Sequence, residues 1–359
     1  MELQQVEVEV AEGVGDRVHN NVIIHIMKNY LQRILNNVLG AGLLIGISLI
    51  AGVFFGKFYF SNSSVQRSDC VSKLTFLKPN IDCESLDSTA DKLSSLQSKL
   101  EVMVQGLKKT GKTKRASVFV RDLNTSRFAG VDDTDVYYMA SLLKTPLLIG
   151  GFKLAEVEPK ILEQTITYNG VPNLYGEQVM KTEKPLIVGE TYMVRDLLKR
   201  SIVYSDNTAS QILFDFFPEG FLDRIMQALG IQHTRPDGEV ENLTTARTYA
   251  NIFRILYNAS YLTKEYSNEA LKILSEVSFD NGATSLLPKD LLVAHKFAER
   301  TLVYENGGVA IRQFHECGIV YTDNAPYIFC IMTEGDNYQI LEKAVADISL
   351  TVYDEMIKD

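Results

Sequence analysis

Ser141 and Lys144 stand three positions apart at the start of residues 141–155, whose apolar spacing predicts a helix. This spacing places both side chains on one face of a helix. A lysine amine that burial makes neutral can take the proton of a serine hydroxyl and turn a weak nucleophile into an effective one. The helix N-terminus adds backbone N–H groups near a developing oxyanion. Alone, the pattern is also typical of a capping serine followed by an exposed lysine.

Two further polar clusters follow in the chain. Ser205-Asp206-Asn207 lies in a helical region, where a hydroxyl can relay a proton and an amide can hold a substrate carbonyl. These residue types are equally typical of a turn or a helix cap. Lys296 follows an apolar run that predicts a strand, and a lysine there would attract an acidic group of a substrate. On its own, it is an ordinary lysine at a strand end.

The hydrophobic patterns along the chain predict the order of the strands and helices that must position these residues. The segments expected to be strands are 116–123, a short stretch after a turn at 124–126, 291–296, 316–321 and 327–333. The segments expected to be helical are 86–107, most of 141–278, and 339–356. A two-stranded hairpin is rarely stable alone, so strands from both ends of the chain must share one sheet. The expected fold class is α+β: a three-layer α/β/α arrangement with an antiparallel sheet flanked by helices, plus an all-helical lobe.

The composition indicates a folded, acidic protein. With 359 residues and 46% hydrophobic content, the chain can build a substantial core. A formal net charge of -9 leaves no basic excess for a phosphate backbone, so no nucleic-acid partner is expected. The histidines are scattered and no CxxC pair is present, so we expect neither a metal nor a cofactor. The pairing of Cys70, Cys83, Cys317 and Cys330 stays open, because four cysteines allow three connectivities.

An apolar segment near the N-terminus predicts a membrane anchor. No charged residue stands between Arg33 and Lys57, and about 20 helical residues cross a bilayer core of about 30 Å. The expected boundaries are 1–37 for a cytoplasmic arm, 38–60 for a single transmembrane helix, 61–85 for a stalk and 86–359 for the catalytic domain. A lipid bilayer is therefore an expected partner, through one helix, and the oligomeric state stays open.

Together the motifs resemble those of the class A serine β-lactamases and the related penicillin-binding proteins. That family carries Ser-x-x-Lys, Ser-Asp-Asn and Lys-Thr-Gly in this order. The first two stand complete here, in Ser141-Leu142-Leu143-Lys144 and Ser205-Asp206-Asn207, and the third is recognisable at Lys296. The resemblance covers residues 86–359. It implies a domain outside the cytoplasmic membrane of a bacterium, acting on cell-wall peptides or on β-lactam-like small molecules that mimic them.

The resemblance also implies roles for residues. Ser141 would be the acylated nucleophile, Lys144 its base, and Ser205 the group that passes the proton on. The backbone N–H groups of Ser141 and Glu299 would form the oxyanion hole.

The same resemblance gives two residues to substrate binding. Asn207 would orient the substrate, and Lys296 would attract its carboxylate.

Two departures from the family pattern bear on activity. Phe297 and Ala298 stand where the family has Thr or Ser and then Gly, which removes a hydroxyl that holds the substrate carboxylate. Arg300 and Arg312 are candidates for a compensating cation, and an exposed position on the surface is the alternative for each. No Glu-x-x-Leu-Asn follows the Ser-Asp-Asn element; the nearby acids are Asp237, Glu239 and Glu241.

Two hypotheses follow from these patterns. The first is a membrane-anchored serine hydrolase or acyltransferase, such as a D,D-peptidase, that forms an acyl-enzyme on Ser141 and deacylates β-lactams poorly. The second is a catalytically impaired module on the same fold that binds or senses cell-wall peptides. The sequence leaves the natural substrate, and hydrolysis versus transpeptidation, undecided.

Overall fold

The structure is a computed structural model of the whole chain. The residues that it describes are 28, 76–77, 93–176, 181–231, 242–303, 307–323 and 326–358. The chain divides into two units, 1–69 and 70–359, and the described elements below belong to the second. The predicted arm, membrane anchor and stalk lie outside the described residues, apart from Lys28, Phe76 and Leu77. Within the described ranges, no helix has the length and apolar character that crossing a membrane requires.

The second unit combines helices with short and long strands. Its helices are α2 (Ser94–Lys109), η1 (Ala140–Leu143), α3 (Lys144–Ala155), η2 (Pro159–Glu163), α4 (Val194–Val203), α5 (Asn207–Phe216), α6 (Phe221–Ala228), α7 (Ala246–Tyr257), α8 (Lys264–Leu274) and α9 (Tyr338–Met356). Its strands are β1 (Arg115–Asp122), β2 (Phe128–Val131), β3 (Val136–Tyr138), β4 (Thr165–Thr167), β5 (Thr191–Met193), β6 (Leu243–Thr245), β7 (Leu292–Val303), β8 (Val309–Tyr321) and β9 (Tyr327–Gly335).

One antiparallel sheet joins strands from both ends of the domain, as the sequence predicted. Its order is β2-β1-β9-β8-β7, so β1 pairs with β9 across more than two hundred residues of sequence. β7 lies at the edge of this sheet and pairs only with β8 among the described strands. One edge of β7 therefore has no partner strand among the described residues.

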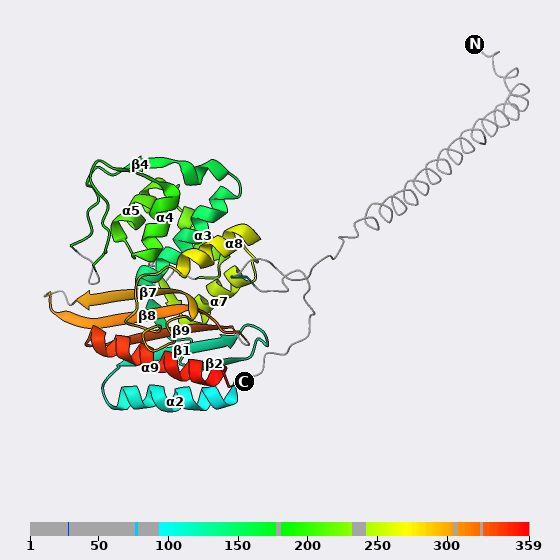
Figure 1. The fold of residues 1–359 in the computed structure, drawn as a ribbon, viewed down its shortest axis with the longest axis vertical. Helices are drawn as coiled ribbons and strands as arrows, with labels where there is room; N and C mark the ends of the chain where they lie inside the picture. Colours follow the sequence, from blue (N-terminus) through cyan, green and yellow to red (C-terminus); the bar gives the residue numbers. More distant parts are fainter. Residues whose placement is uncertain are drawn as a thin grey trace, which may run out of the picture. The chain divides into compact units, whose positions relative to one another are not determined.

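Helices cover both faces of the sheet (Figure 1). α2 and α9 lie on one face, where their apolar stripes pack against alternate residues of the strands; Val118, Phe329 and Ile331 belong to this core. On the other face, α7 contacts β1, β8 and β9, and the lobe of α3 to α6 and α8 continues that core. The α/β/α arrangement matches the expected fold class, whereas the lobe that was expected to be all-helical also contains the two-stranded sheet of β4 and β5.

The longest strands differ in extent from the expectation. The sequence predicted that a strand ends at Lys296, but β7 continues to Val303 because its second half pairs with the first half of β8. The pairing runs through Phe297↔Glu316 and Glu299↔Phe314. Lys296 therefore lies inside the strand, and Glu299 lies on it as well.

Two short ladders were not expected from the sequence. β3 pairs with β6, and β4 pairs with β5, each over three residues. Strands of this length carry too little alternation to be recognised by pattern. The β3–β6 ladder immediately precedes η1, so it helps to fix where Ser141 begins its turn.

Cys317 and Cys330 lie directly opposite each other on β8 and β9 and form a disulfide. The sequence had left open whether they were two buried thiols or a bonded pair. Both residues are fully buried on the face that also carries α7. Cys70 and Cys83 lie outside the described residues.

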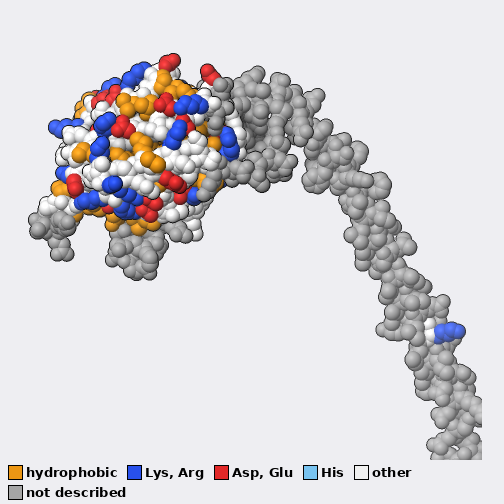
Figure 2. Space-filling model, turned by 90° about the horizontal axis from the view of Figure 1, so that it is seen from below, with side chains coloured by type: hydrophobic (Ala, Val, Ile, Leu, Met, Phe, Trp, Pro, Cys, Tyr) orange, Lys and Arg blue, Asp and Glu red, His pale blue; other side chains and the backbone are white. Residues whose placement is uncertain are grey.

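Charged side chains of both signs are interspersed on the face of the molecule presented in Figure 2. Ion pairs also join separate elements of the second unit, such as Lys99 with Glu355 and Arg115 with Glu334. Ion pairs near the surface contribute little to stability individually.

Candidate active site

Ser141 lies in the 3-10 turn η1, directly before α3 begins at Lys144. The turn is fixed from both sides: the hydroxyl of Tyr249 donates to the carbonyl of Leu142 at 2.8 Å, and η1 packs against β7. Ala140, just before the serine, has a φ of 46°, in the left-handed region that non-glycine residues rarely adopt. Such an observed outlier is typical of functional sites. Ser141 itself is half-buried.

The amine of Lys144 is buried against Ser205 and Asn207. Nζ donates to Ser205 O at 2.6 Å, to Ser205 Oγ at 3.1 Å and to Asn207 Oδ1 at 2.7 Å. Burial lowers the pKa of Lys144 to about 7, against an opposing effect of the Asp206 and Glu299 carboxylates. A substantial fraction of this amine is therefore neutral at pH 7, as a general base requires.

Ser205 connects α4 to α5 and brings two amines together. Its φ of 49° is also left-handed, and the residue is 5% exposed. Its hydroxyl accepts from Lys296 Nζ at 3.0 Å as well as from Lys144. Burial, and then the neighbouring Lys144 charge, lower the pKa of Lys296 well below its usual value. Two ammonium groups on one hydroxyl repel each other, so the arrangement favours keeping at least one amine neutral.

The structure thus brings together four of the residues selected from the sequence. Lys144, Ser205, Asn207 and Lys296 share hydrogen bonds, and Ser141 lies one turn before Lys144. The three hydrogen bonds of Lys144 go to Ser205 and Asn207, and none of the three goes to Ser141. Catalytic hydrogen bonds often tighten only when substrate binds.

Glu299 lies farther along the edge strand β7 and is half-buried. Its carboxylate opposes the lowering of the pKa of both Lys144 and Lys296. It therefore lies within electrostatic reach of the two amines. The prediction that its backbone N–H and that of Ser141 stabilise an oxyanion stays a prediction.

Asp206 and Tyr175 support the site, although the sequence reasoning gave neither a role. Asp206 caps α5 by accepting from the N–H of Ala209 at 3.0 Å. The hydroxyl of Tyr175 donates to Asp206 Oδ2 at 3.2 Å and accepts from the N–H of Leu186 at 2.7 Å. Burial raises the pKa of the fully buried Asp206. Asp206 stood inside a recognised motif, whereas no sequence signal marked Tyr175.

The two arginines suggested as compensating cations lie in different places. The guanidinium of Arg300 stacks on the ring of Tyr138, 4.1 Å from its centroid, three residues before Ser141. Arg312 donates instead to the carbonyl of Asp336. Of the two arginines, only Arg300 contacts the segment that directly precedes η1, through Tyr138.

Asp237, Glu239 and Glu241, the acids nearest to where the family carries Glu-x-x-Leu-Asn, lie outside the described residues. Among the residues that the structure does describe, no cluster of His, Cys, Asp and Glu has the arrangement of a metal site.

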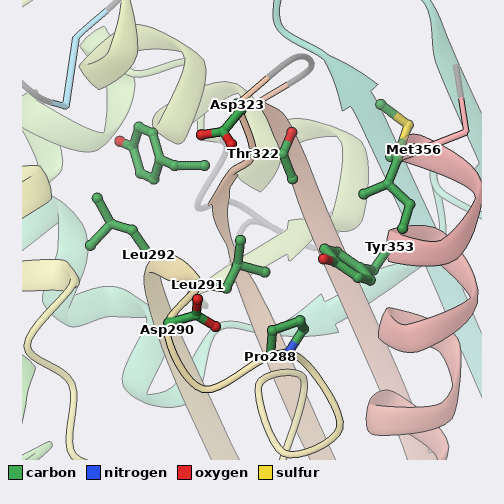
Figure 3. Close-up of a pocket in the computed structure, with 10 residues that line it drawn as sticks. Pro288, Asp290, Leu291, Leu292, Thr322, Asp323, Tyr353 and Met356 are labelled. Carbon is green, nitrogen blue, oxygen red and sulfur yellow. The ribbon is translucent and has the colours of Figure 1, made fainter.

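A cavity of about 580 Å³ lies away from this site, where β7 begins and β8 ends (Figure 3). Leu291, Asp290, Tyr353 and Met356 are among the residues that line it. None of the six site residues selected from the sequence lines this cavity. The expected catalytic cleft is therefore not this cavity.

The comparisons with known proteins agree with this geometry. A sequence model of the β-lactamase enzyme family matches residues 95–356. The chain belongs to the β-lactamase enzyme family. This membership confirms the resemblance drawn from the Ser-x-x-Lys and Ser-Asp-Asn motifs. Comparison with curated protein sequences finds no match.

Solved structures with the same fold include PBP-A and several β-lactamases. A PBP-A variant, solved as an acyl-enzyme complex with penicillin G, is 20% identical; the match covers 76% of this chain and 100% of that one, with a TM-score of 0.63. The TLA-1 extended-spectrum β-lactamase is 19% identical over 73% of this chain and 99% of its own, with a TM-score of 0.61. A class A β-lactamase from Mycobacterium abscessus is 17% identical over 71% and 98%, also with a TM-score of 0.61. At these identities the similarity establishes the fold of this β-lactamase family protein.

Proposed function

We propose that this β-lactamase family protein is a serine hydrolase or acyltransferase that forms an acyl-enzyme on Ser141, with Lys144 as the base. One observation carries the proposal: the Lys144 amine is buried one turn from Ser141, and burial lowers its pKa to about 7. An exposed lysine would be almost wholly protonated at neutral pH and would not accept a proton. The depressed pKa is therefore the property that general-base catalysis needs.

The proposed reaction assigns one step to each of these groups. The neutral amine of Lys144 takes the proton of Ser141 Oγ as this oxygen bonds to the substrate carbonyl carbon. When the bond to the leaving group breaks, the leaving group takes a proton from Ser205 Oγ, and Ser205 regains one from Lys144 or Lys296. The N–H groups of Ser141 and Glu299 stabilise the oxyanion. Water or an amine then releases the acyl group.

Slow release of β-lactam-derived acyl groups is part of the proposal. Class A enzymes activate the deacylating water with a loop glutamate, and the corresponding stretch of this chain lacks Glu-x-x-Leu-Asn. A stable acyl-enzyme is the expected consequence. PBP-A has been solved as such a complex with penicillin G, which makes a β-lactam a suitable reagent for this chain.

We further propose that the domain works outside the cytoplasmic membrane on cell-wall peptides, anchored by residues 38–60. The uncharged apolar stretch between Arg33 and Lys57 supports the anchor. The Cys317–Cys330 disulfide supports an oxidising compartment, because disulfides persist mainly outside the cytosol.

A second candidate function is a binding or sensing module without turnover. Phe297, in place of a hydroxyl residue after Lys296, is the observation that favours it. Such a module would keep its ligand affinity when Ser141 is replaced by alanine, whereas an enzyme would lose its covalent adduct.

The deciding experiment treats the full-length chain with a fluorophosphonate, a small neutral reagent that labels activated serines, and reads the intact mass. Labelling of the unaltered chain, its loss in Ser141→Ala and a decrease of about 10²- to 10⁴-fold in Lys144→Ala would support the enzyme. Ser210→Ala removes another buried hydroxyl and is the matched control. An unlabelled native chain would contradict the proposal.

A further inference from the structure

The ammonium group of Lys296 has no open side in the described structure. The residue is 0% exposed. Its Nζ donates to Ser205 Oγ at 3.0 Å and to the carbonyl of Phe297 at 2.8 Å, and it lies 3.9 Å from the centroid of the Phe297 ring. A substrate carboxylate would have to displace the ring or the protein acceptors to reach this amine.

A second aromatic ring holds Phe297 in this position. Phe279 stacks on it with a centroid separation of 4.2 Å and an interplanar angle of 26°. The loop that carries Phe279 is tied to the end of α4, because both the N–H and the hydroxyl of Ser278 donate to the carbonyl of Val203 at 3.1 Å. This loop is therefore bound to the chain at Val203, two residues before Ser205. The pair of rings is thus connected to the site through Phe297 on β7 and through the loop of Phe279.

Negative charge is already present near this position. Glu299 lies two positions after Phe297 on β7, and its carboxylate opposes the lowering of the pKa of Lys296. A second carboxylate, from a substrate, would meet a like charge as well as the negative face of an aromatic ring. The substrate carboxylate would also lose its hydrogen bonds to water, and residue 297 offers no hydroxyl to replace them.

We propose that Phe297 and Phe279 are specificity-determining residues that close the carboxylate position beside Lys296, so that the site accepts acyl donors whose group at that position is uncharged. The substrate class is then a neutral ester or amide, such as a peptide acyl donor whose terminal carboxylate is amidated or esterified. The inference rests on the proposed acyl transfer at Ser141 and assigns Lys296 to Ser205 rather than to the substrate.

The test compares two reagents that differ only in this charge. Penicillin G and its methyl ester carry the same reactive ring, one with a free carboxylate and one without. Acylation of the full-length chain is followed by intact mass, and peptide mapping locates the adduct. Labelling by the fluorophosphonate is measured in parallel, because it requires the Ser141 nucleophile but no carboxylate recognition.

For the unaltered chain, we expect the methyl ester to acylate Ser141 at least as fast as the free acid. A free acid that reacts ten or more times faster would overturn the inference while leaving the proposed function intact. A chain labelled by the fluorophosphonate but not by the methyl ester would overturn it as well. Failure of all three reagents would count against the proposed function itself.

Two variants then locate the selectivity. Phe297→Thr restores a hydroxyl beside Lys296, and we expect it to raise the ratio of acid to ester acylation at least tenfold. Phe279→Ala removes the supporting ring from a half-buried loop position and should raise the ratio in the same direction. An unchanged ratio in both variants, with unfolding curves that show they are folded, would refute the assignment.

Phe314→Leu is the matched control. The Phe314 ring also contacts Phe279, with centroids 5.7 Å apart, but it comes from β8 and no contact with Lys296 is described for it. Loosening of the core alone would change this variant as much as the others. The inference requires its ratio of acid to ester acylation to stay at the level of the unaltered chain.

Discussion

Lys144 and Lys296 donate hydrogen bonds to the same oxygen atom, the hydroxyl of Ser205, at 3.1 and 3.0 Å. Both amines are buried, and burial is the largest cause of the lowered pKa of each. In the proposed reaction, the proton that leaves Ser141 would enter a short network in which either amine can hold it.

The rate of acylation at Ser141 should rise with pH and reach half its maximum near pH 7, the pKa to which burial lowers Lys144. Below that pH the amine is protonated and cannot act as a base. The measurement is the rate of fluorophosphonate labelling between pH 5 and pH 9. The reagent has no group that ionises in this interval, so the profile reports the protein. Lys153→Ala, which removes a lysine paired with Glu156 on α3, should leave the profile unchanged. A flat profile would argue against Lys144 as the base.

Replacing Ser205 with alanine should slow acylation by roughly 10²-fold, the usual magnitude for loss of a proton-transfer group. It should also move the midpoint of the pH profile, because both amines lose their shared acceptor. Ser210→Ala is the matched control: Ser210 is similarly buried on α5, but its hydroxyl donates to the carbonyl of Asp206. A purely structural role for Ser205 would lower the rate without moving the midpoint.

Lys144→Met should stabilise the fold most strongly at low pH. The pKa of Lys144 is lowered in the folded protein, from 10.5 to about 7, so the unfolded chain binds more protons between these values. The penalty of the lysine is thus complete below about pH 7 and declines as the pH rises toward 10.5. We expect the free energy of unfolding to rise by about a few kcal/mol at pH 6, as a pKa shift of this kind implies, and by less at pH 9. Urea unfolding at both values measures it, and equal gains would contradict the assignment.

Glu316→Ala should lower the free energy of unfolding by about 3 kcal/mol. The fully buried carboxylate accepts from the N–H of Ala283 at 2.7 Å and lies 2.7 Å from His295 Nδ1, so its removal leaves two buried partners unsatisfied. The exposed Glu163→Ala is the control for loss of a negative charge. Similar urea midpoints for the two variants would show that the buried pair contributes little.

Phe76→Ala should lower the free energy of unfolding by about 2 kcal/mol, less than a central core phenylalanine. Phe76 is 9% exposed, stacks edge-on against Tyr321 and donates its N–H to Asn268 Oδ1 at 3.2 Å. Val157→Ala, at an 85% exposed position, should change stability very little. If both variants unfold as the unaltered chain does, the segment around Phe76 is not part of the cooperative unit.

Much of the fold can be predicted from the sequence, because long segments with a clear hydrophobic period are assigned most reliably to helix or strand. β1, β9 and α9 agree with the expected segments within two residues, whereas β8 begins at Val309 instead of residue 316 and α2 is described from Ser94 instead of residue 86. The need of these strands for partners predicted one shared sheet. β7 was taken to end at Lys296, since its extension depends on pairing with β8, which a single segment does not reveal. The short β3–β6 and β4–β5 ladders are likewise specified by tertiary contacts.

For the site, the order of the motifs predicted which segments meet, and Lys144, Ser205 and Lys296 share hydrogen bonds. Their chemical roles stay predictions. The sequence showed that Phe297 lacks a hydroxyl, but not that its ring lies over Lys296, because this depends on Phe279 in a separate loop. Tyr175 was missed because its contact with Asp206 comes from a loop with no periodic pattern.

The contact of Phe76 with Tyr321 also joins a segment that precedes α2 to the end of β8. The hydroxyl of Tyr321 donates to the carbonyl of Phe76 at 3.0 Å, and Asn268 Oδ1 accepts from the N–H of the same residue. Both backbone groups of Phe76 are therefore bound by side chains that lie 192 and 245 residues later in the chain. The position of this early segment thus depends on β8 and α8 having already folded.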